Sequence, residues 1–311
     1  MKVLCQVGEQ IARTVEDSVP SAEVILVPGE GALPDGVSGE VLLTTAMGSA
    51  NLASVLERGV RWVQTLGTGV DRFPLDLVGD RILTCSRGAS AVPIAEWVLA
   101  TMLAFEKRLP ESWIDERPEG WNVPAGGSLG ALHGRTLGLV GLGGIGTAVA
   151  QRALPFGMRV NALRRSGAPS PIADVTIARS LPEVLHGADH VVVTAPATPE
   201  TRHLLDADAF AAMKPGAHLV NIARGALIDQ DALRVALDRD IVAMASLDTV
   251  TPEPLPEGHW MYGHPKVRLS PHISWSMPDA LDALLDVFLE NLRRYERGDP
   301  LLGVVDVAAG Y

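Results

Sequence analysis

The feature that most constrains the fold is a glycine-rich run that directly follows an apolar segment. Residues 136–146 read TLGLVGLGGIG, and residues 147–154 contain good helix formers with an apolar face. This order predicts a strand, a tight glycine turn and a helix. The next apolar run, 158–163, comes at the spacing of a unit in which a helix connects two parallel strands. The sequence therefore predicts a parallel α/β domain built around this turn.

Three glycines of this run suit a turn that binds a dinucleotide. Gly141 permits the tight turn out of the strand, Gly143 lets the backbone approach a pyrophosphate, and Gly146 lets the helix pack closely on the sheet. The first N–H groups of the helix are available to the phosphates. We therefore expect a dinucleotide site, and a glycine-rich turn without a ligand is the alternative.

The end of the second strand indicates which dinucleotide is held. A site for NAD usually carries an acidic residue about 20 residues after the first glycine, where it binds the ribose hydroxyls. This chain has Arg164, Arg165 and Ser166 there. Two guanidinium groups and a hydroxyl suit a 2′-phosphate. We expect NADP(H), with NAD(H) as a possible second cofactor; the alternative is that these arginines form a solvated rim.

Composition excludes several other classes of protein. With 311 residues the chain can form two domains, and its net charge of −11 disfavours non-specific binding to nucleic acid. Cys5 and Cys85 lie in apolar runs, so we expect buried thiols and no disulfide. No apolar run approaches the length of a membrane span, and the N-terminus has a strand pattern. A cytoplasmic protein without a metal site is expected.

Residues 1 to about 105 alternate apolar runs with helical stretches, which predicts a first parallel sheet of the flavodoxin-like type. A long helical stretch, 89–107, follows. Residues 110–134 are rich in Gly, Pro and Trp and have no sustained period. We interpret them as a domain boundary and a crossing arm in which Trp113 and Trp121 are covered, for example by another subunit; an ordinary surface loop is the alternative.

A second alternating series runs from residue 137 to about 273, and an amphipathic helix is predicted over 278–297. The apolar stripe of this predicted helix comprises Leu281, Leu284, Leu285, Phe288, Leu289 and Leu292. This helix is expected to return to the first domain. The predicted fold is α/β, with two doubly wound parallel-sheet domains. A Rossmann dinucleotide-binding domain, 108–277, is inserted into a flavodoxin-like substrate domain formed by residues 1–107 and 278–311.

Three polar residues follow predicted strands of the second series, at the sheet edge that holds the cofactor. Arg224 can bind a substrate carboxylate with its forked guanidinium. His272 can give a proton to a carbonyl oxygen, and Glu253 can orient the imidazole. Each residue alone is more often structural or solvated. Together and in this order they suit the reduction of a 2-keto acid.

Five segments carry a resemblance to a known family. They are LHGRTLGLVGLGGIGTAVAQRALPFGM from residue 132, APATPETRHLL from 195, VNIARGALID from 220, LDTVTPEPLP from 247 and SPHISW from 270. The chain resembles the D-isomer-specific 2-hydroxyacid dehydrogenases over nearly its whole length. Arg164 stands where this family usually has Asp, and in this the chain resembles the NADP-preferring glyoxylate/hydroxypyruvate reductases.

The resemblance implies roles for individual residues. Arg224 would bind substrate, Glu253 and His272 would form the acid/base pair, and backbone N–H groups of Thr68 and Gly69 would hold the substrate carboxylate. Trp275, where many members have small residues, is expected to shape the pocket. The implied cofactor contacts are Gly144 and Ile145 at the pyrophosphate, Asp248 near the nicotinamide amide, and Ala195, Pro196, Thr201, Ile222, Ala223 and Ser274 around the cofactor. A homodimer formed through the nucleotide domain is implied as well.

The sequence leaves two other functions open. The same site could oxidise another small anion, such as phosphite. A nucleotide-sensing binding protein, like the family's corepressors, could also keep Arg224, Glu253 and His272. Glu253 argues against the formate dehydrogenase branch, which resembles this chain but has Gln at that position.

Overall fold

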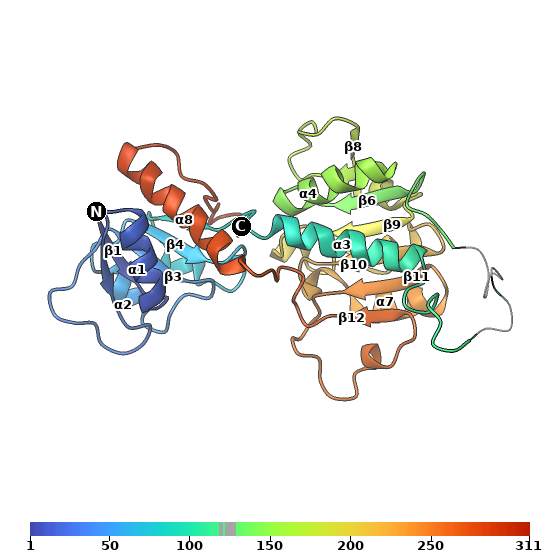
Figure 1. The fold of residues 1–311 in the computed structure, drawn as a ribbon, viewed down its shortest axis with the longest axis horizontal. Helices are drawn as coiled ribbons and strands as arrows, with labels where there is room; N and C mark the ends of the chain where they lie inside the picture. The colour runs from blue at the N-terminus through green and yellow to red at the C-terminus, as the bar shows by residue number, and fades with distance from the viewer. Residues whose placement is uncertain (118–120, 122–128) are drawn as a thin grey trace. The chain divides into compact units, whose positions relative to one another are not determined.

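The computed structural model describes residues 1–117, 121 and 129–311. The chain divides into two compact units, which we call unit 1 and unit 2. Unit 1 comprises Met1–Ser90 and Met277–Tyr311, and unit 2 comprises Ala91–Ser276. Each unit is a parallel sheet with helices packed on it (Figure 1).

The sheet of unit 1 has the strand order β2-β1-β3-β4-β5, and all its pairs are parallel. This is the order of flavodoxin-like folds. Its elements are β1 (Lys2–Cys5), α1 (Glu9–Ser18), β2 (Glu23–Leu26), β3 (Val41–Thr45), α2 (Leu52–Leu56), β4 (Trp62–Leu66), the 3-10 turn η1 (Leu75–Leu77) and β5 (Ile82–Cys85).

Helix α8 (Ala280–Arg297) packs on the sheet of unit 1, far from it in sequence. The Phe288 and Tyr295 rings lie 5.6 and 5.2 Å from the Trp62 ring, centroid to centroid. The buried Asn291 donates from Nδ2 to Gln64 Oε1 at 3.2 Å. Leu281 is exposed at the start of the helix, so its predicted place in the buried stripe is wrong.

The sheet of unit 2 has the parallel strand order β12-β11-β10-β9-β6-β7-β8. The order reverses between β6 and β9, which is where open α/β sheets bind their ligands. The strands are β6 (Thr136–Val140), β7 (Arg159–Leu163), β8 (Val175–Ala178), β9 (His190–Val193), β10 (Ala217–Asn221), β11 (Val242–Leu247) and β12 (Val267–Leu269). The sequence pattern predicts strands over 137–140, 158–163, 190–194, 218–222 and 243–247, so β8 is an additional strand. Strand β12 corresponds to the strand expected before His272.

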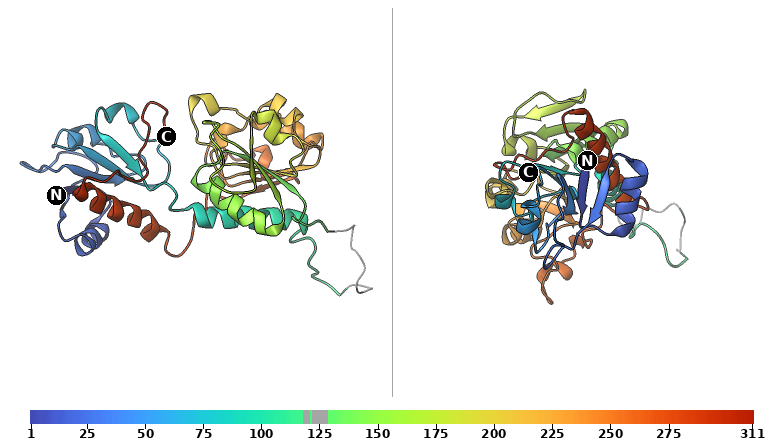
Figure 2. Two further views of the ribbon diagram at one scale, coloured as in Figure 1. Left: turned by 90° about the horizontal axis from the view of Figure 1, so that it is seen from above. Right: turned by 90° about the vertical axis from the view of Figure 1, so that its left-hand side faces the viewer.

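Helices cover both faces of this sheet, as the left view of Figure 2 shows. Helices α3 (Ala91–Glu106) and α4 (Gly144–Ala153) pack together on one face. The other face holds α5 (Leu181–Leu185), α6 (Ala207–Ala211) and α7 (Gln230–Asp238). Short 3-10 turns η2 (Leu154–Phe156), η3 (Pro199–Thr201), η4 (Gly225–Leu227) and η5 (Trp260–Tyr262) complete the unit.

Helix α3 belongs to unit 2, whereas the predicted boundary after residue 107 assigns it to the first domain. The physical reason is its packing. Ile94, Val98 and Met102 are buried in the same apolar cluster as Ala148 and Val149 of α4. The unit boundaries therefore fall after Ser90 and after Ser276.

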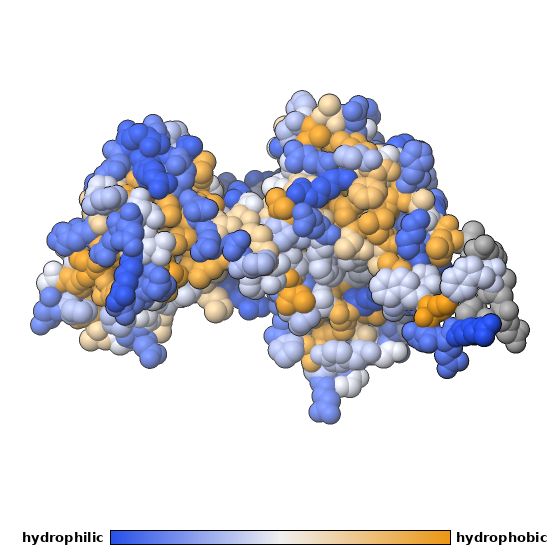
Figure 3. All heavy atoms as spheres, in the orientation of Figure 1, coloured by the Kyte–Doolittle hydropathy of each residue, from blue (hydrophilic) through white to orange (hydrophobic). Residues whose placement is uncertain are grey.

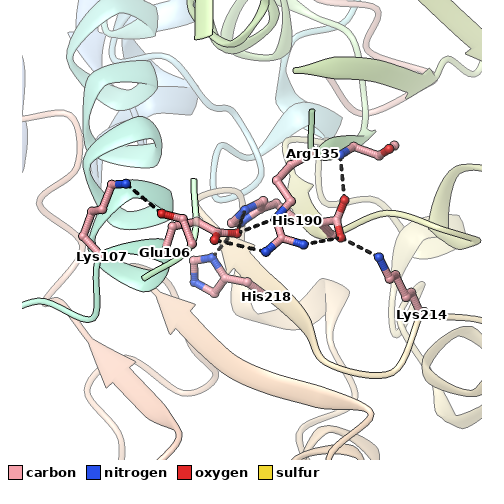
Figure 4. Close-up of polar contacts among 9 residues, drawn as sticks. Glu106, Lys107, Arg135, His190, Lys214 and His218 are labelled. Atoms are coloured by element: carbon pink, nitrogen blue, oxygen red, sulfur yellow. Dashed lines mark hydrogen bonds and ion pairs between the residues drawn. The ribbon is translucent and has the colours of Figure 1, made fainter. Parts of the chain in front are cut away.

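A buried polar network ties the end of α3 to the sheet of unit 2 (Figure 4). Glu106 Oε1 lies 3.1 Å from His190 Nε2, and His190 Nδ1 lies 3.1 Å from His218 Nδ1. Arg135 Nε lies 3.1 Å from the Glu106 carboxylate, and Phe105 stacks on His218. His190 and His218, which lack a catalytic context in the sequence, are thus buried structural residues.

Part of the predicted arm, residues 118–120 and 122–128, lies outside the described residues. Among the described residues of the arm, Trp113 is 71% exposed and Trp121 is 76% exposed in the single chain. The face of unit 2 formed by α3 and α4 carries further apolar side chains (Figure 3). Among the described residues, no helix is long and apolar enough to cross a membrane.

Candidate active site

The glycine turn lies between β6 and α4, next to the point where the strand order of unit 2 reverses. Gly141 has φ +115°, a conformation that side-chain-bearing residues rarely adopt, and an added Cβ would lie 2.8 Å from Ala195 N. A Cβ on Gly146 would lie 2.5 Å from Gly141 O. These two glycines are therefore required for the turn to form and for α4 to pack against it.

Gly143 differs from Gly141 and Gly146, because the space beside its Cα is open. A Cβ built on Gly143 meets nothing within 4 Å in the described structure. Gly143 is also the N-cap residue of α4, so the first N–H groups of this ten-residue helix are uncapped by a side chain. The end of the helix thus presents hydrogen-bond donors beside an open space, which fits the pyrophosphate of a dinucleotide.

Arg164 follows β7 directly, beside the glycine turn, because Gly141 N donates to Leu163 O at 3.1 Å. Its Nη1 donates to Pro169 O at 2.7 Å. Arg165 and Ser166 are exposed on the same loop. The sequence-predicted residues for a 2′-phosphate thus lie together at the carboxyl end of the strand next to β6.

The remaining predicted cofactor residues follow β9 and β10. The loop after β9 holds Ala195 and Pro196, and Thr201 closes it by donating from Oγ1 to Pro196 O at 2.8 Å. Ile222 and Ala223 follow β10 and are buried. These residues therefore lie at the carboxyl edge of adjacent strands, on the side of the sheet where the glycine turn lies.

Arg224 lies at the end of β10, where the chain turns into η4. Its carbonyl accepts a hydrogen bond from Asn221 Nδ2 at 3.0 Å, and its Nη1 donates to Ala223 O at 2.7 Å. The next residue, Gly225, packs so closely that an added Cβ would lie 2.0 Å from the carbonyl carbon of Val250. This close contact joins the loop that carries Arg224 to the loop after β11.

Glu253 and His272 are brought together from the loops after β11 and β12. Glu253 Oε2 lies 2.9 Å from His272 Nδ1, and Glu253 Oε1 accepts from Val250 N at 3.2 Å. Both side chains are partly buried. Because Nδ1 is engaged by the carboxylate, Nε2 is the imidazole nitrogen that can face a substrate.

Asp248 has a structural task that sequence reasoning missed. Its carboxylate accepts from Ser270 Oγ at 2.5 Å, from Ile273 N at 2.9 Å and from Ser274 N at 3.0 Å. It therefore holds the loop on which His272 lies. An acidic residue directly after β11 was visible in the sequence, but its partners follow a different strand.

Two predicted substrate-binding residues belong to unit 1. Thr68 and Gly69 follow β4, and Thr68 O accepts a hydrogen bond from Cys85 Sγ at 3.6 Å. Their role stays a prediction. Cys5 and Cys85 are both buried free thiols, as expected, and burial raises the pKa of each.

Comparison with known families agrees with this geometry. Residues 99–274 match the family model described as the NAD binding domain of D-isomer specific 2-hydroxyacid dehydrogenases. The chain belongs to this family. The resemblance stated from the sequence motifs is confirmed, and the chain is an NAD(P)-dependent oxidoreductase of the 2-hydroxyacid dehydrogenase type.

Similar proteins of this dehydrogenase family come from several bacteria. Glyoxylate/hydroxypyruvate reductase A of Serratia proteamaculans is 32% identical over 84% of this chain and 79% of its own length. D-3-phosphoglycerate dehydrogenase of Bacillus subtilis is 33% identical over 78% of this chain, which spans only 46% of that longer protein.

A solved structure supports the fold of this dehydrogenase. The D-isomer specific 2-hydroxyacid dehydrogenase from Xanthobacter autotrophicus Py2, in complex with NADPH and MES, is 27% identical and superposes with a TM-score of 0.81. That match covers 100% of this chain and 99% of that one. The predicted α/β fold with two parallel-sheet domains is confirmed.

Proposed function

We propose that this dehydrogenase reduces a small 2-keto acid with NADPH, and that glyoxylate and hydroxypyruvate are its substrate class. The observation that carries the proposal is the acid/base pair, with Glu253 Oε2 2.9 Å from His272 Nδ1 beside the loop of Arg224. The relative from Serratia proteamaculans, named for both substrates, supports this choice.

The chemistry follows from the charges of these three residues. Arg224 binds the substrate carboxylate, and its positive charge polarises the adjacent carbonyl group. His272 gives its Nε2 proton to the carbonyl oxygen in reduction and takes it back in oxidation. Glu253 fixes the ring through Nδ1, so that Nε2 is the nitrogen that faces the substrate. The nicotinamide supplies or accepts the hydride when it is bound.

A preference for NADP(H) rests on the loop after β7. Arg164, Arg165 and Ser166 take the place where an acidic residue would bind the ribose of NAD. Two guanidinium groups and a hydroxyl can make charge-assisted hydrogen bonds to a 2′-phosphate. The NADPH bound to the Xanthobacter autotrophicus relative agrees with this assignment.

We also propose a cytoplasmic homodimer formed through unit 2. The sequence of α3, AVPIAEWVLATMLAFE, is apolar around most of the helix, and one side of it is buried in unit 2. Trp113 and Ile114 add exposed apolar surface nearby in the chain. Light scattering of the purified chain tests this proposal, and a monomer at micromolar concentration would contradict it.

The enzymatic proposal is tested by comparing NADPH with NADH against glyoxylate, hydroxypyruvate, pyruvate and bulkier 2-keto acids. We expect turnover of the small keto acids with a higher kcat/KM for NADPH. Tight binding of NADPH without turnover of any keto acid would overturn the proposal. Phosphite oxidation or a sensing role would then take its place.

A further inference from the structure

The backbone of His272 has an unusual conformation. Its φ is +55°, in the left-handed region that costs a residue with a side chain about 1–2 kcal/mol. A residue stays there only when its surroundings hold it. The direction of the imidazole follows from this backbone, because a change of φ would swing the ring away from Glu253.

Hydrogen bonds hold the chain on both sides of the His272 Cα. On the amide side, His272 N donates to Asp248 O and to Ser270 O, each at 3.0 Å. The Asp248 carboxylate then holds the amides of the next two residues, Ile273 and Ser274. Because the Ile273 amide and the His272 carbonyl belong to one planar peptide unit, Asp248 holds this unit from its N–H side.

The indole of Trp275 holds the same peptide unit from its carbonyl side. Trp275 Nε1 donates to His272 O at 2.8 Å, a short hydrogen bond between residues only three apart in the chain. Trp275 is 43% exposed, so the residue contributes little to the apolar core. The polar group of this side chain therefore bonds the backbone of His272 itself.

We propose that Trp275 is a positioning residue for His272: its indole N–H locks the His272 carbonyl and thereby keeps Nδ1 on Glu253 and Nε2 toward the substrate. This inference rests on the proposed role of His272 as the proton donor. It goes beyond the expectation that Trp275 shapes the pocket, because it assigns the function to the N–H group.

The substitution Trp275→Phe separates the N–H group from the ring. Phe keeps an aromatic side chain but cannot donate, so we expect kcat for the reduction of glyoxylate to fall about three- to tenfold, as for one lost hydrogen bond. The KM for glyoxylate should stay within about twofold, because an aromatic ring remains at this position. Trp260→Phe is the matched control, since Trp260 lies on η5 under Arg234, and it should leave both constants unchanged.

A second measurement is independent of turnover. The Nδ1 proton of His272, shared with the Glu253 carboxylate, should give a low-field proton resonance in NMR spectra of the full chain. His272→Gln assigns the signal by its loss. In Trp275→Phe we expect this signal to broaden or vanish, because the ring leaves Glu253 and its proton exchanges with water.

Three results would overturn the inference. An unchanged kcat in Trp275→Phe shows that the N–H group has no effect on the reaction. A raised KM with unchanged kcat makes Trp275 a pocket wall only. An unchanged Nδ1 resonance shows that the imidazole is held without the indole. If the parent chain reduces no keto acid, the proposed function fails, and the resonance alone decides the positioning.

Discussion

At the scale of single residues, the proposed chemistry depends on how firmly Glu253 holds the imidazole of His272. The carboxylate is itself fixed, since its second oxygen accepts from Val250 N at 3.2 Å. A fixed carboxylate stabilises the imidazolium more than a mobile one, because no reorganisation is needed during proton transfer. The two residues therefore act as one unit, and their substitutions should not be additive.

We expect His272→Ala to lower kcat/KM by about 10²- to 10⁴-fold, the usual contribution of a general acid. Glu253→Gln should cost less, because the amide oxygen can still accept from Nδ1 while the negative charge is lost. The dissociation constant for NADPH should stay within about twofold in both variants, since neither residue is among the expected cofactor contacts. Steady-state kinetics and fluorescence titration measure the two effects. Turnover of His272→Ala at the parent rate would refute the mechanism.

The sequence indicated that these residues lie at neighbouring strand ends, but it indicated only part of their surroundings. Arg224, Glu253 and His272 each follow a strand, and parallel strands bring their carboxyl ends to one edge. The contacts of Asp248 and Trp275 depend on the left-handed backbone of His272, which the residue type does not signal, because positive φ is uncommon for every residue with a side chain. Such contacts need the folded backbone to be seen.

At the scale of elements, the turn from β6 into α4 contains glycines with two different tasks. Gly146 is needed for packing, because its Cβ would overlap Gly141 O, whereas Gly143 faces open space. We expect Gly143→Ala to keep the melting temperature but to weaken NADPH binding at least about tenfold, because the methyl group occupies the space of the pyrophosphate. Calorimetric titration measures the binding.

Gly146→Ala is the matched control for that variant. A glycine-to-alanine change inside an exposed helix usually stabilises it by about 1 kcal/mol. Here we expect a lower melting temperature, because the added methyl group meets backbone atoms. If Gly143→Ala binds NADPH as tightly as the parent, the open space beside Gly143 does not hold the pyrophosphate.

The buried network between α3, β9 and β10 predicts how stability depends on pH. Burial lowers the pKa of His218 well below its ordinary value, and the charges of His190 and Arg268 lower it further. The folded chain keeps this ring neutral, while the unfolded chain binds a proton below about pH 6.5. The free energy of unfolding is therefore unaffected by this ring above about pH 6.5. Below that pH it falls by about 1.4 kcal/mol for each pH unit, because only the unfolded chain binds the proton.

Glu106 and Asp189 extend this loss to lower pH. Burial opposes the ionisation of Glu106, but the hydrogen bond of His190 and the charge of Arg135 outweigh it, so the pKa is lowered. In Asp189, Lys214 and the Thr136 amide likewise outweigh burial and lower the pKa. Both carboxylates stabilise the fold above their unfolded pKa of about 4, and this stability is lost as pH falls through the lower folded value.

Urea unfolding between pH 7 and pH 5 tests the contribution of His218. The parent should lose stability over this range, and His218→Phe should show a flatter profile because the titrating ring is gone. This variant should be about 1–3 kcal/mol less stable at pH 7, since His190 Nδ1 and Ser246 Oγ lose their partner. His186→Gln, at an exposed histidine, should retain the slope of the parent. An unchanged slope in His218→Phe would contradict the assignment.

The sequence predicted elements well where a pattern was long and poorly where it was short. The long amphipathic stripe of α8 was visible, but β8 has four residues, too few for a period to stand out. The apolar sequence of α3 correctly predicted a helix. It did not predict that this helix packs in unit 2 rather than in unit 1. A helix that is apolar on most sides can pack on either neighbour, so its place is decided by the tertiary contacts with α4.

At the scale of the whole molecule, the two units differ in how they are built from the chain. Each of the four apolar clusters of the described structure lies within a single unit. Unit 2 is one continuous segment, whereas unit 1 needs two segments, because α8 supplies Phe288 and Leu292 to the core around Trp62. A fragment ending at Ser90 lacks that helix and should not fold alone.

We therefore expect a fragment of residues 91–276 to fold by itself and to bind NADPH within about fivefold of the affinity of the full chain. It contains both faces of its sheet, the glycine turn and the loop after β7. Thermal unfolding of the fragment should be cooperative, because its core is complete. Gly143→Ala within the fragment should weaken NADPH binding as in the full chain, which identifies the binding as specific. If Thr68 and Gly69 hold the substrate carboxylate, as the family resemblance implies, the fragment should turn over no keto acid. A fragment that folds but does not bind NADPH would show that unit 1 contributes to the cofactor site.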